Sequence, residues 1–392
     1  MKKRLFSYVV VCLLFAVALF SGNVSAANTS ALGLNKTVRS SGTEREAEIY
    51  QIKVKTPGKL NINFKHENLF ETKTYWTIEV LAKDMETVLQ TIYSTGVDEN
   101  LTASSLGLSK GTYYIRVWSR KECNDNYSDA DYRLTAKFKK SADWEVEYNE
   151  VTKRTNDEQA GAKTISVNKA VSGTVLTRDD VDFFKVKIKK KGYIVLKMSH
   201  KNVLDSEICW NVALVDSKTN VITSIQSLGT QKSASTARIG VTPGTYYVKV
   251  SAGRNHNAAD YAVTVGYKAA NNWETEYKSG HNNNDLNYAN TVAYGGSIMG
   301  TLATEDDVDY FKFRVPAKKT VTVALSHKYK ANSDSFYKVT VLSSKLNELA
   351  HYDCKGVNKT SRKKFNLKKG VYYIKVEKGS AYNKMDYTIS VK

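Results

Sequence analysis

The heptapeptide GTYYIRV at residues 111–117 recurs as GTYYVKV at residues 244–250 and as GVYYIKV at residues 370–376. Apolar or aromatic residues occupy alternate positions of each copy, which is the pattern of a β-strand with one buried face. The copies are separated by the length of a small domain. Recurrence of one strand at that spacing predicts three copies of a single β domain along the chain.

Other residues recur in step with this strand. A histidine follows an aromatic residue by 16 positions in every copy, and an Asp-Tyr pair opens the last alternating segment of every copy. Glycine and asparagine interrupt the alternating segments about every eight to twelve residues, which is typical of antiparallel sandwiches. The sequence therefore predicts an all-β protein of three tandem antiparallel, jelly-roll-like β-sandwich domains. Their predicted ranges are 27–140, 141–269 and 270–392, and the recurring histidines are His66, His200 and His327.

The N-terminus has the order of a secretory signal peptide. Lys2, Lys3 and Arg4 precede an apolar run over residues 5–20, and small residues up to Ala26 provide a cleavage site. This apolar run is short for a membrane span, which needs roughly 20 residues. We therefore expect residues 1–26 to be removed and the mature chain to be secreted to the extracellular space without a transmembrane anchor.

The chain is strongly basic, with 58 Lys and Arg residues against 39 Asp and Glu residues and a formal net charge of +19. Such a surface favours anionic partners, and lysines along strands also guard sheet edges against pairing. The cations are spread over all repeats without a DNA-reading motif, so we expect no specific nucleic acid binding. After removal of residues 1–26, three of the four cysteines remain, namely Cys123, Cys209 and Cys354, and an odd number at unrelated positions favours buried thiols over a disulfide framework.

Acidic linkers precede the second and third repeats. The segments WEVEYN at 144–149 and WETEY at 273–277 each lead to a glycine and then to DDVDFF at 179–184 or DDVDYF at 306–311. This order resembles the bacterial pre-peptidase C-terminal domain, a β-sandwich accessory module of secreted proteins that includes the collagen-binding domains of clostridial collagenases. The resemblance covers most of the second and third repeats and, more weakly, the first. It implies a non-catalytic module of the kind that often accompanies a peptidase, although this sequence shows no peptidase segment.

The linker acids are candidate calcium ligands, because Ca²⁺ takes roughly six to eight oxygen ligands from converging segments. The alternative is a solvated acidic turn whose aspartates cap backbone amides. The resemblance favours calcium, since it implies that linker acids and the aspartate pair bind the ion where the linker docks. The first repeat has Glu46 and Glu48 at the positions of Asp180 and Asp182 and almost no linker, so we predict no calcium there. The predicted ligands are Glu145, Glu147, Asn149, Asp157, Asp179 and Asp182 in the second repeat, and Glu274, Glu276, Asp285, Asp306 and Asp309 in the third.

The outward phase of the recurring heptapeptide strand is a candidate binding face. A tyrosine beside a cation could stack on a glycan or grip a protein such as collagen. The resemblance implies the same use, because surface tyrosines bind collagen in the similar modules. The alternative is that a cross-strand neighbour covers these tyrosines. The candidate residues are Tyr114, Arg116, Trp118, Tyr247, Lys249, Tyr373 and Lys375.

The recurring histidines do not indicate catalysis. A hydrolase needs a nucleophile, a base and an orienting acid in one place, and triplication of a whole catalytic centre is less plausible than a hydrogen-bonded histidine at the core edge. The sequence therefore predicts a secreted non-enzymatic adhesion protein, with calcium as a cofactor of the second and third repeats. Its expected partner is an extracellular protein such as collagen, or a polysaccharide or cell-wall polymer. Two alternatives stay open, namely a structural spacer and an accessory subunit of a secreted peptidase or hydrolase.

Overall fold

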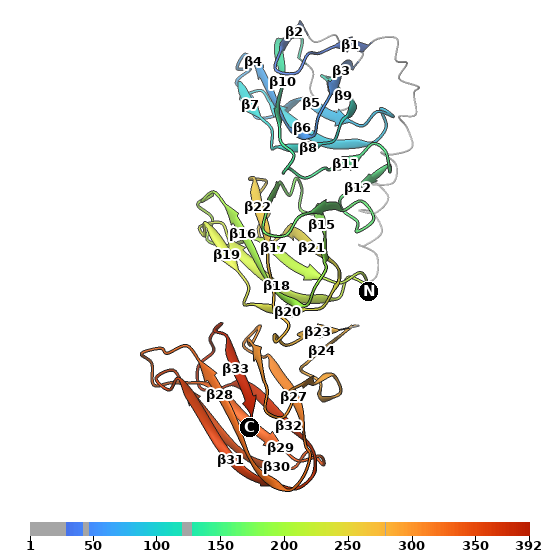
Figure 1. Cartoon of the computed structure of the whole chain (residues 1–392). Coiled ribbons are helices and arrows are strands. Elements are labelled where there is room, and N and C mark those ends of the chain that lie inside the picture. The colour runs from blue at the N-terminus through green and yellow to red at the C-terminus, as the bar shows by residue number, and fades with distance from the viewer. Residues whose placement is uncertain (1–28, 42–46, 120–127, 279) are drawn as a thin grey trace, which may run out of the picture. The chain divides into compact units, whose positions relative to one another are not determined.

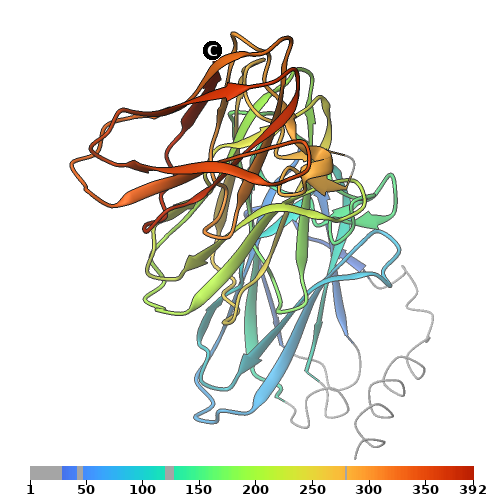
Figure 2. The same ribbon diagram turned by 90° about the horizontal axis from the view of Figure 1, so that it is seen from below.

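The computed structural model describes residues 29–41, 47–119, 128–278 and 280–392 (Figure 1). The predicted signal peptide and Cys123 lie outside the described residues. Strands dominate the described chain, and a short 3-10 turn, η2 (Leu286–Tyr288), is visible as a coil in Figure 2. Within the described ranges, no helix has the length and apolar character needed to cross a membrane. The all-β prediction is therefore confirmed.

Contacts divide the chain into two compact units. One unit contains most of the chain up to Phe138, and the other contains Lys139–Lys392 together with Thr56–Asn61 and Ser104–Ser109. The sheets themselves follow one pattern three times along the chain. The residue boundaries of the three sequence repeats stay a prediction.

The first repeat forms a five-stranded sheet and a second sheet around strand β4. In the first sheet β1 pairs parallel with β3, and the other pairs are antiparallel. The first sheet has the order β1 (Thr29–Ala31), β3 (Glu48–Val54), β9 (Gly111–Trp118), β5 (Thr74–Leu81) and β6 (Val88–Thr95). The second contains β2 (Thr37–Ser41), β10 (Asp131–Lys140), β4 (Gly58–His66), β7 (Asn100–Thr102) and β8 (Leu106–Leu108).

The second repeat has the same arrangement. Its linker forms a short hairpin of β11 (Tyr148–Asn149) and β12 (Arg154–Thr155). One sheet has the order β13 (Lys163–Ile165), β15 (Val181–Ile188), β21 (Gly244–Ala252), β17 (Ile208–Val215) and β18 (Val221–Leu228). The other has the order β14 (Ala170–Gly173), β22 (Tyr261–Ala269), β16 (Gly192–His200) and β19 (Ser233–Ser235), with β20 (Ile239–Val241) also paired to β16.

The third repeat follows the same order again. Its linker forms a hairpin of β23 (Tyr277–Lys278) and β24 (His281–Asn282). One sheet has the order β25 (Asn290–Thr291), β27 (Val308–Val315), β32 (Gly370–Lys378), β29 (Ser335–Leu342) and β30 (Glu348–Lys355). The other has the order β26 (Ser297–Gly300), β33 (Tyr387–Val391), β28 (Lys319–His327) and β31 (Thr360–Leu367).

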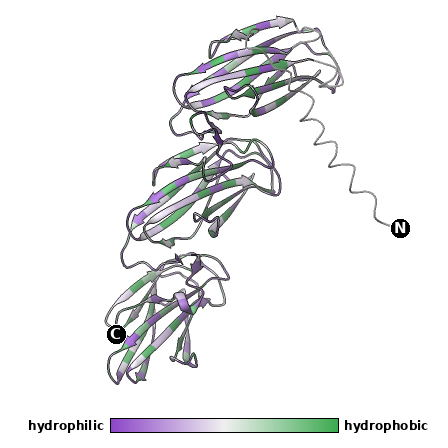
Figure 3. Cartoon of the chain, turned by 90° about the vertical axis from the view of Figure 1, so that its right-hand side faces the viewer, coloured by the Kyte–Doolittle hydropathy of each residue, from purple (hydrophilic) through white to green (hydrophobic). Residues whose placement is uncertain are grey.

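The recurring heptapeptide forms the central strand of each five-stranded sheet, as β9, β21 and β32. Buried and more exposed residues alternate along these strands, and bands of hydrophobic and hydrophilic colour run along the strands of the chain in Figure 3. In β21 the inward residues Tyr246, Val248 and Val250 join Trp210 in the core between the two sheets. Each fully buried apolar side chain of this size contributes roughly 1.5–3 kcal/mol to the stability of the fold.

The recurring histidines are structural residues at the edge of each core. The rings of His66 and His200 pack on Trp76 and Trp210, with ring centroids 4.2 Å and 4.0 Å apart. The Nδ1 of each ring lies within hydrogen-bond distance of the carbonyl of the following residue, and Nε2 lies near a buried serine hydroxyl. Both ring nitrogens of His66 and His200 are thus engaged by the fold, whereas the buried Nε2 of His327 has no hydrogen-bond partner among the described residues.

Candidate metal centres

The linker of the second repeat lies in extended conformation beside strand β14. Trp144 forms a parallel bridge with Ser172, and the Glu145 amide donates to the Ser172 carbonyl at 2.8 Å. Because side chains alternate along an extended segment, Glu145 and Glu147 project to the same side. Both side chains are buried, with 1% and 7% of their surface exposed. The linker therefore delivers two carboxylates into the interior.

Strand β15 delivers two more carboxylates to the same place. Asp182, at its start, is fully buried, and Asp180 in the preceding turn is 8% exposed. The Tyr261 hydroxyl donates to Asp182 Oδ2 at 2.6 Å, and Asn156 Nδ2 donates to Asp182 Oδ1 at 2.5 Å. On the linker side, the Thr174 amide donates to Glu145 Oε1 at 2.7 Å. The acids are therefore held by fixed donors from several strands.

Two groups of carboxylates form around the shared residue Glu147. Oxygens of Glu145, Glu147 and Asp182 lie within 4.8 Å of one another, and so do oxygens of Glu147, Asp157 and Asp180. Within the described chain, three buried oxygens at this place have no hydrogen-bond partner. They are Glu147 Oε2, Asn156 Oδ1 and Asp180 Oδ1. Unpartnered buried oxygens are costly, so they indicate room for a cation rather than a self-sufficient hydrogen-bond network.

The third repeat builds a matching group. Oxygens of Glu274, Glu276 and Asp309 lie within 4.8 Å of one another, and all three residues are buried. Asn283 Nδ2 donates to Asp309 Oδ1 at 2.6 Å, and the Tyr387 hydroxyl donates to Asp309 Oδ2. The Thr301 amide donates to Glu274 Oε1 at 2.8 Å, while Asp307 Oδ2 accepts from the Ala303 amide at 2.6 Å. Among the described residues, the unpartnered buried oxygens here are Asn283 Oδ1 and Asn284 Oδ1.

A glycine makes room for each linker glutamate. A Cβ atom on Gly173 would collide with the Glu145 carboxylate and the Tyr261 ring. A Cβ atom on Gly300 would lie 2.6 Å from the Tyr387 hydroxyl and 2.7 Å from the Glu274 carboxyl carbon. Real Cβ atoms do not approach neighbours this closely. The last residue of β14 and of β26 is therefore glycine because the carboxylate occupies the space of a side chain.

Burial and mutual repulsion raise the pKa values of these acids. Burial is the larger cause at Asp180 and Asp182, where it raises the pKa to about 8 and about 6. Burial, followed by repulsion from neighbouring carboxylates, raises the pKa of the linker glutamates well above the usual range. No lysine or arginine within the described ranges forms an ion pair with them. The groups therefore hold protons or a cation near neutral pH.

The donor set fits a hard divalent cation. Every candidate ligand atom is a carboxylate or amide oxygen, and neither histidine nor cysteine takes part in the groups. Oxygen-only sets favour calcium or magnesium over zinc and copper, which prefer nitrogen and sulfur. The residues present thus fit the predicted calcium.

The structure brings together most, but not all, of the predicted ligands. Asp179 and Asp306 are exposed and lie one residue before the buried Asp180 and Asp307. Asn149 Oδ1 accepts hydrogen bonds from the following turn at 2.9 Å and 3.2 Å, and Asp285 caps η2. The residues that converge as predicted are Glu145, Glu147, Asp157, Asp182, Glu274, Glu276 and Asp309.

Sequence reasoning missed three partners of these acids, namely the buried Asp180, Asn283 and Asp307. A signal for Asp180 and Asp307 exists, because each lies two residues before the inward Asp182 or Asp309 and shares its phase. Asn283 comes from an irregular linker segment that has no periodicity, so spacing alone could not select it.

Among the described residues of the first repeat, the hydrogen-bonding neighbours of the acid Glu48 are hydroxyl groups and not other carboxylates. Glu48, at the start of β3, accepts hydrogen bonds from the hydroxyls of Ser40, Tyr50 and Tyr132, the last at 2.5 Å. Glu46 lies outside the described residues. Within the described part of the first repeat, no group of three acids with metal-ligand spacing is found. Three hydroxyl donors lie where the other repeats have carboxylate neighbours, and the absence of calcium from the first repeat stays a prediction.

The predicted tyrosine face is mostly covered. Tyr114 packs against Ile49 and Leu81, and Tyr247 packs against Phe183 and Val215, so that both tyrosines are 9% exposed. This corrects the expectation that strand alternation leaves them on the surface, because cross-strand neighbours build a small second cluster there. Tyr373 is half-buried.

Two of the three cations of this face, Arg116 and Lys375, pair with a carboxylate. Arg116 pairs with Glu79 at 2.7 Å and lies 4.4 Å from the centroid of the half-buried Trp118 ring. Lys375 donates to Glu377 at 2.7 Å, and Lys249 is half-buried. These residues therefore form part of the folded surface rather than an open strip of tyrosine and free charge.

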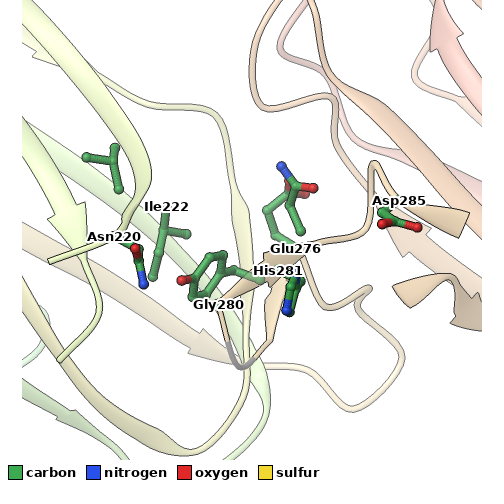
Figure 4. A pocket seen from close by; sticks show the side chains of 9 residues that line it. Asn220, Ile222, Glu276, Gly280, His281 and Asp285 are labelled. Atoms are coloured by element: carbon green, nitrogen blue, oxygen red, sulfur yellow. The ribbon is translucent and has the colours of Figure 1, made fainter. Parts of the chain in front are cut away.

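A polar pocket adjoins the acids of the third repeat (Figure 4). It has a volume of about 390 Å³, and Glu276 is among its lining residues. Asn220, Ile222, His281 and Asp285 line other parts of it. Glu276 therefore belongs both to the pocket wall and to the carboxylate group.

One protein family matches part of the chain. Residues 307–378 match the family described as the bacterial pre-peptidase C-terminal domain. The match lies within the third repeat. It begins at the buried Asp307 and contains Asp309 and the third heptapeptide, whereas the linker acids Glu274 and Glu276 lie outside it. Three tandem copies of this domain stay a prediction, and no curated protein matches the sequence.

Several solved structures are similar to parts of the chain. The pre-peptidase C-terminal domain of collagenase from Bacillus anthracis is 25% identical, covers 26% of this chain and 94% of its own, and has a TM-score of 0.22. The CUB1-EGF-CUB2 region of human MASP-1/3 is 8% identical, covers 59% of this chain and 99% of its own, and has a TM-score of 0.19. A structure described as the triple jelly roll fold and turret assembly in an archaeal virus is 9% identical, covers 88% of this chain and 80% of its own, and has a TM-score of 0.21.

Proposed function

We propose that this chain is a secreted, non-catalytic binding protein whose second and third sandwiches are stabilised by calcium. The observation that carries the proposal is the pair of buried acid groups with unpartnered oxygens. Four buried carboxylates meet in the second repeat, namely Glu145, Glu147, Asp180 and Asp182. They repel one another unless protons or cations intervene. A bound Ca²⁺ supplies positive charge and accepts the unpartnered oxygens as ligands.

The chain's own residues determine what such binding does. Glu145 and Glu147 belong to the linker, whereas Asp180 and Asp182 belong to the sheet, so shared coordination fixes the linker against its sandwich. Tyr261 and Asn156 hold Asp182 in place before an ion arrives. A linker fixed in this way limits the orientations of the module that it precedes, which lowers the entropic cost when several modules bind one surface.

The calcium proposal is tested by two neighbouring substitutions in the mature chain. Asp180→Asn removes a buried carboxylate, and Asp179→Asn removes the exposed carboxylate next to it. Isothermal titration with Ca²⁺ is expected to show at least a tenfold loss of affinity for Asp180→Asn and no change for Asp179→Asn. Equal affinities of the two variants and the wild type contradict the assignment.

The binding role rests on the family match and on the repetition of one module. The proposed partner is an extracellular protein such as collagen, or a polysaccharide or cell-wall polymer, and modules of weak affinity gain avidity when they share one chain. The test is retention of the mature protein on collagen and on cell-wall fractions, with calcium and with chelator. Retention on neither material contradicts adhesion and favours the alternative of a spacer or an accessory subunit.

A further inference from the structure

The segment between β30 and β32 of the third repeat is unusually basic. Residues 357–369 contain six cations and no acid, whereas the corresponding residues 230–243 contain two cations and residues 97–110 contain one cation and two acids. The common fold does not require this charge, because the other two repeats form the same sheet without it. The six cations are Lys359, Arg362, Lys363, Lys364, Lys368 and Lys369.

This segment also has a different structure. It forms one continuous eight-residue strand, β31, along the edge of the sheet β26-β33-β28-β31 (Figure 1). The other repeats place two three-residue strands there. Phe365 and Leu367 of β31 are buried against the core, so the alternate residues Arg362 and Lys364 project from the outer face. Two such residues lie about 6.6 Å apart along a strand.

The outer face around these cations consists of small polar side chains. Thr322 of β28 stands opposite Lys364, and Ser326 lies 3.0 Å from the Thr360 hydroxyl. Thr320 donates to Asn366 at 2.7 Å. By strand alternation, the outward residues of β28, β31 and β33 include neither a carboxylate nor an aromatic ring. The face thus offers cations along its edge and hydroxyl groups across its width.

The cations of β31 differ from those of the opposite sheet in their pairing. In that sheet Lys375 lies 2.7 Å and Lys338 lies 3.9 Å from a carboxylate oxygen of Glu377. Within the described chain, neither Arg362 nor Lys364 forms an ion pair. A row of unpaired like charges repels itself, and an anionic partner with similar spacing removes that repulsion.

We propose that β31 and the outer face beside it bind an extended anionic polymer of sugar or polyol units that carries phosphate or sulfate groups. The cations pair with the charged groups, and the threonine and serine hydroxyls hydrogen-bond the uncharged units. Single-stranded nucleic acid fits less well, because its binding sites supply aromatic platforms on which bases stack. This site is separate from the calcium groups and from the covered tyrosines. The proposal rests on the proposed binding role and names one class of partner for it, and its failure leaves the calcium proposal untouched.

The competing explanation is that the cations only protect the edge of β31 from pairing with another strand. The test uses the mature chain and dextran sulfate as the probe, with the double variant Arg362→Gln/Lys364→Gln. The matched control is Lys312→Gln/Arg314→Gln, which removes the same charges at the same spacing from exposed positions of β27 on the opposite sheet. Both variants are checked for folding by their melting temperatures.

We expect the β31 variant to bind dextran sulfate about tenfold more weakly than the control variant. The slope of log affinity against log salt should fall by about one for each lost cation. Uncharged dextran should not bind. Equal binding by the two variants, or aggregation of the β31 variant with unchanged binding, overturns the proposal in favour of edge protection. Equally tight binding of oligothymidylate, lost in the same variant, overturns the assignment to a sugar or polyol polymer.

Discussion

At the scale of single residues, Gly173 and Gly300 test whether the linker glutamates need the space that a glycine leaves for their carboxylates. We predict that Gly173→Ala lowers calcium affinity at the second repeat at least tenfold, because its Cβ would occupy the space of the Glu145 carboxylate. The control is Gly244→Ala, whose Cβ would meet the Tyr246 ring at an ordinary 3.5 Å. Calorimetric titration should show loss of binding in the first variant only, with the third repeat unaffected. Unchanged calcium binding by Gly173→Ala would contradict the need for this space.

Tyr50 has a role that its counterparts Phe184 and Phe311 cannot have. Its hydroxyl donates to Glu48, and burial raises its pKa. We predict that Tyr50→Phe destabilises the first repeat by about 1 kcal/mol, although phenylalanine occupies this position in the other repeats. Tyr93→Phe, at a tyrosine that is 61% exposed, should change stability by less than about 0.5 kcal/mol. Urea unfolding measures both variants, and equal stabilities count against the hydroxyl network.

At the scale of elements, alternation in the sequence predicts the strands and their buried faces well, because one face of every sheet packs on a core. It predicts the acid groups only in part. The burial of Asp182 and Asp309 follows from the strand phase. The predicted ligands Asp179 and Asp306, in contrast, lie one residue away from the buried Asp180 and Asp307. Alternation also places Tyr247 outward correctly, yet it cannot show that Phe183 and Val215 cover it. Such cover depends on which strands become neighbours, and a periodic pattern does not contain that information.

The buried carboxylates between the linker and the sheet of the second repeat predict an unusual dependence of the free energy of unfolding on pH. Without metal, the folded chain holds protons on Asp180 and Asp182 with pKa values of about 8 and about 6, above the unfolded value near 4. The folded state therefore binds more protons than the unfolded state between about pH 4 and pH 8, and the free energy of unfolding should fall as pH rises through this window.

Calcium should reverse this trend, because ligand carboxylates must lose their protons to bind the ion, and binding strengthens as pH rises. Urea unfolding of the second repeat at pH 5 and pH 8, with calcium and with chelator, measures both slopes. A metal-free stability that rises towards pH 8 contradicts the placement of these acids in the interior.

At the scale of the whole molecule, one chain combines modules of the same topology that are stabilised in different ways. In the first repeat, hydroxyl groups donate hydrogen bonds to the acid, whereas the second and third repeats bring together buried carboxylates for which we propose a bound cation. Removal of calcium should therefore affect one part of the chain and spare another. Occupation of a site at 100 times its dissociation constant stabilises the folded state by about 2.7 kcal/mol, which is large beside the stability of a small domain.

Hydrogen–deuterium exchange of the mature chain, followed by mass spectrometry of its peptides, tests this central claim most directly. We predict that calcium slows exchange in peptides from the linkers at 144–157 and 273–284 and from the starts of β15 and β27. Peptides from β3, β4 and β9 of the first repeat should exchange equally with calcium and with chelator. Equal protection of all three repeats by calcium, or no protection of either linker, would contradict the account.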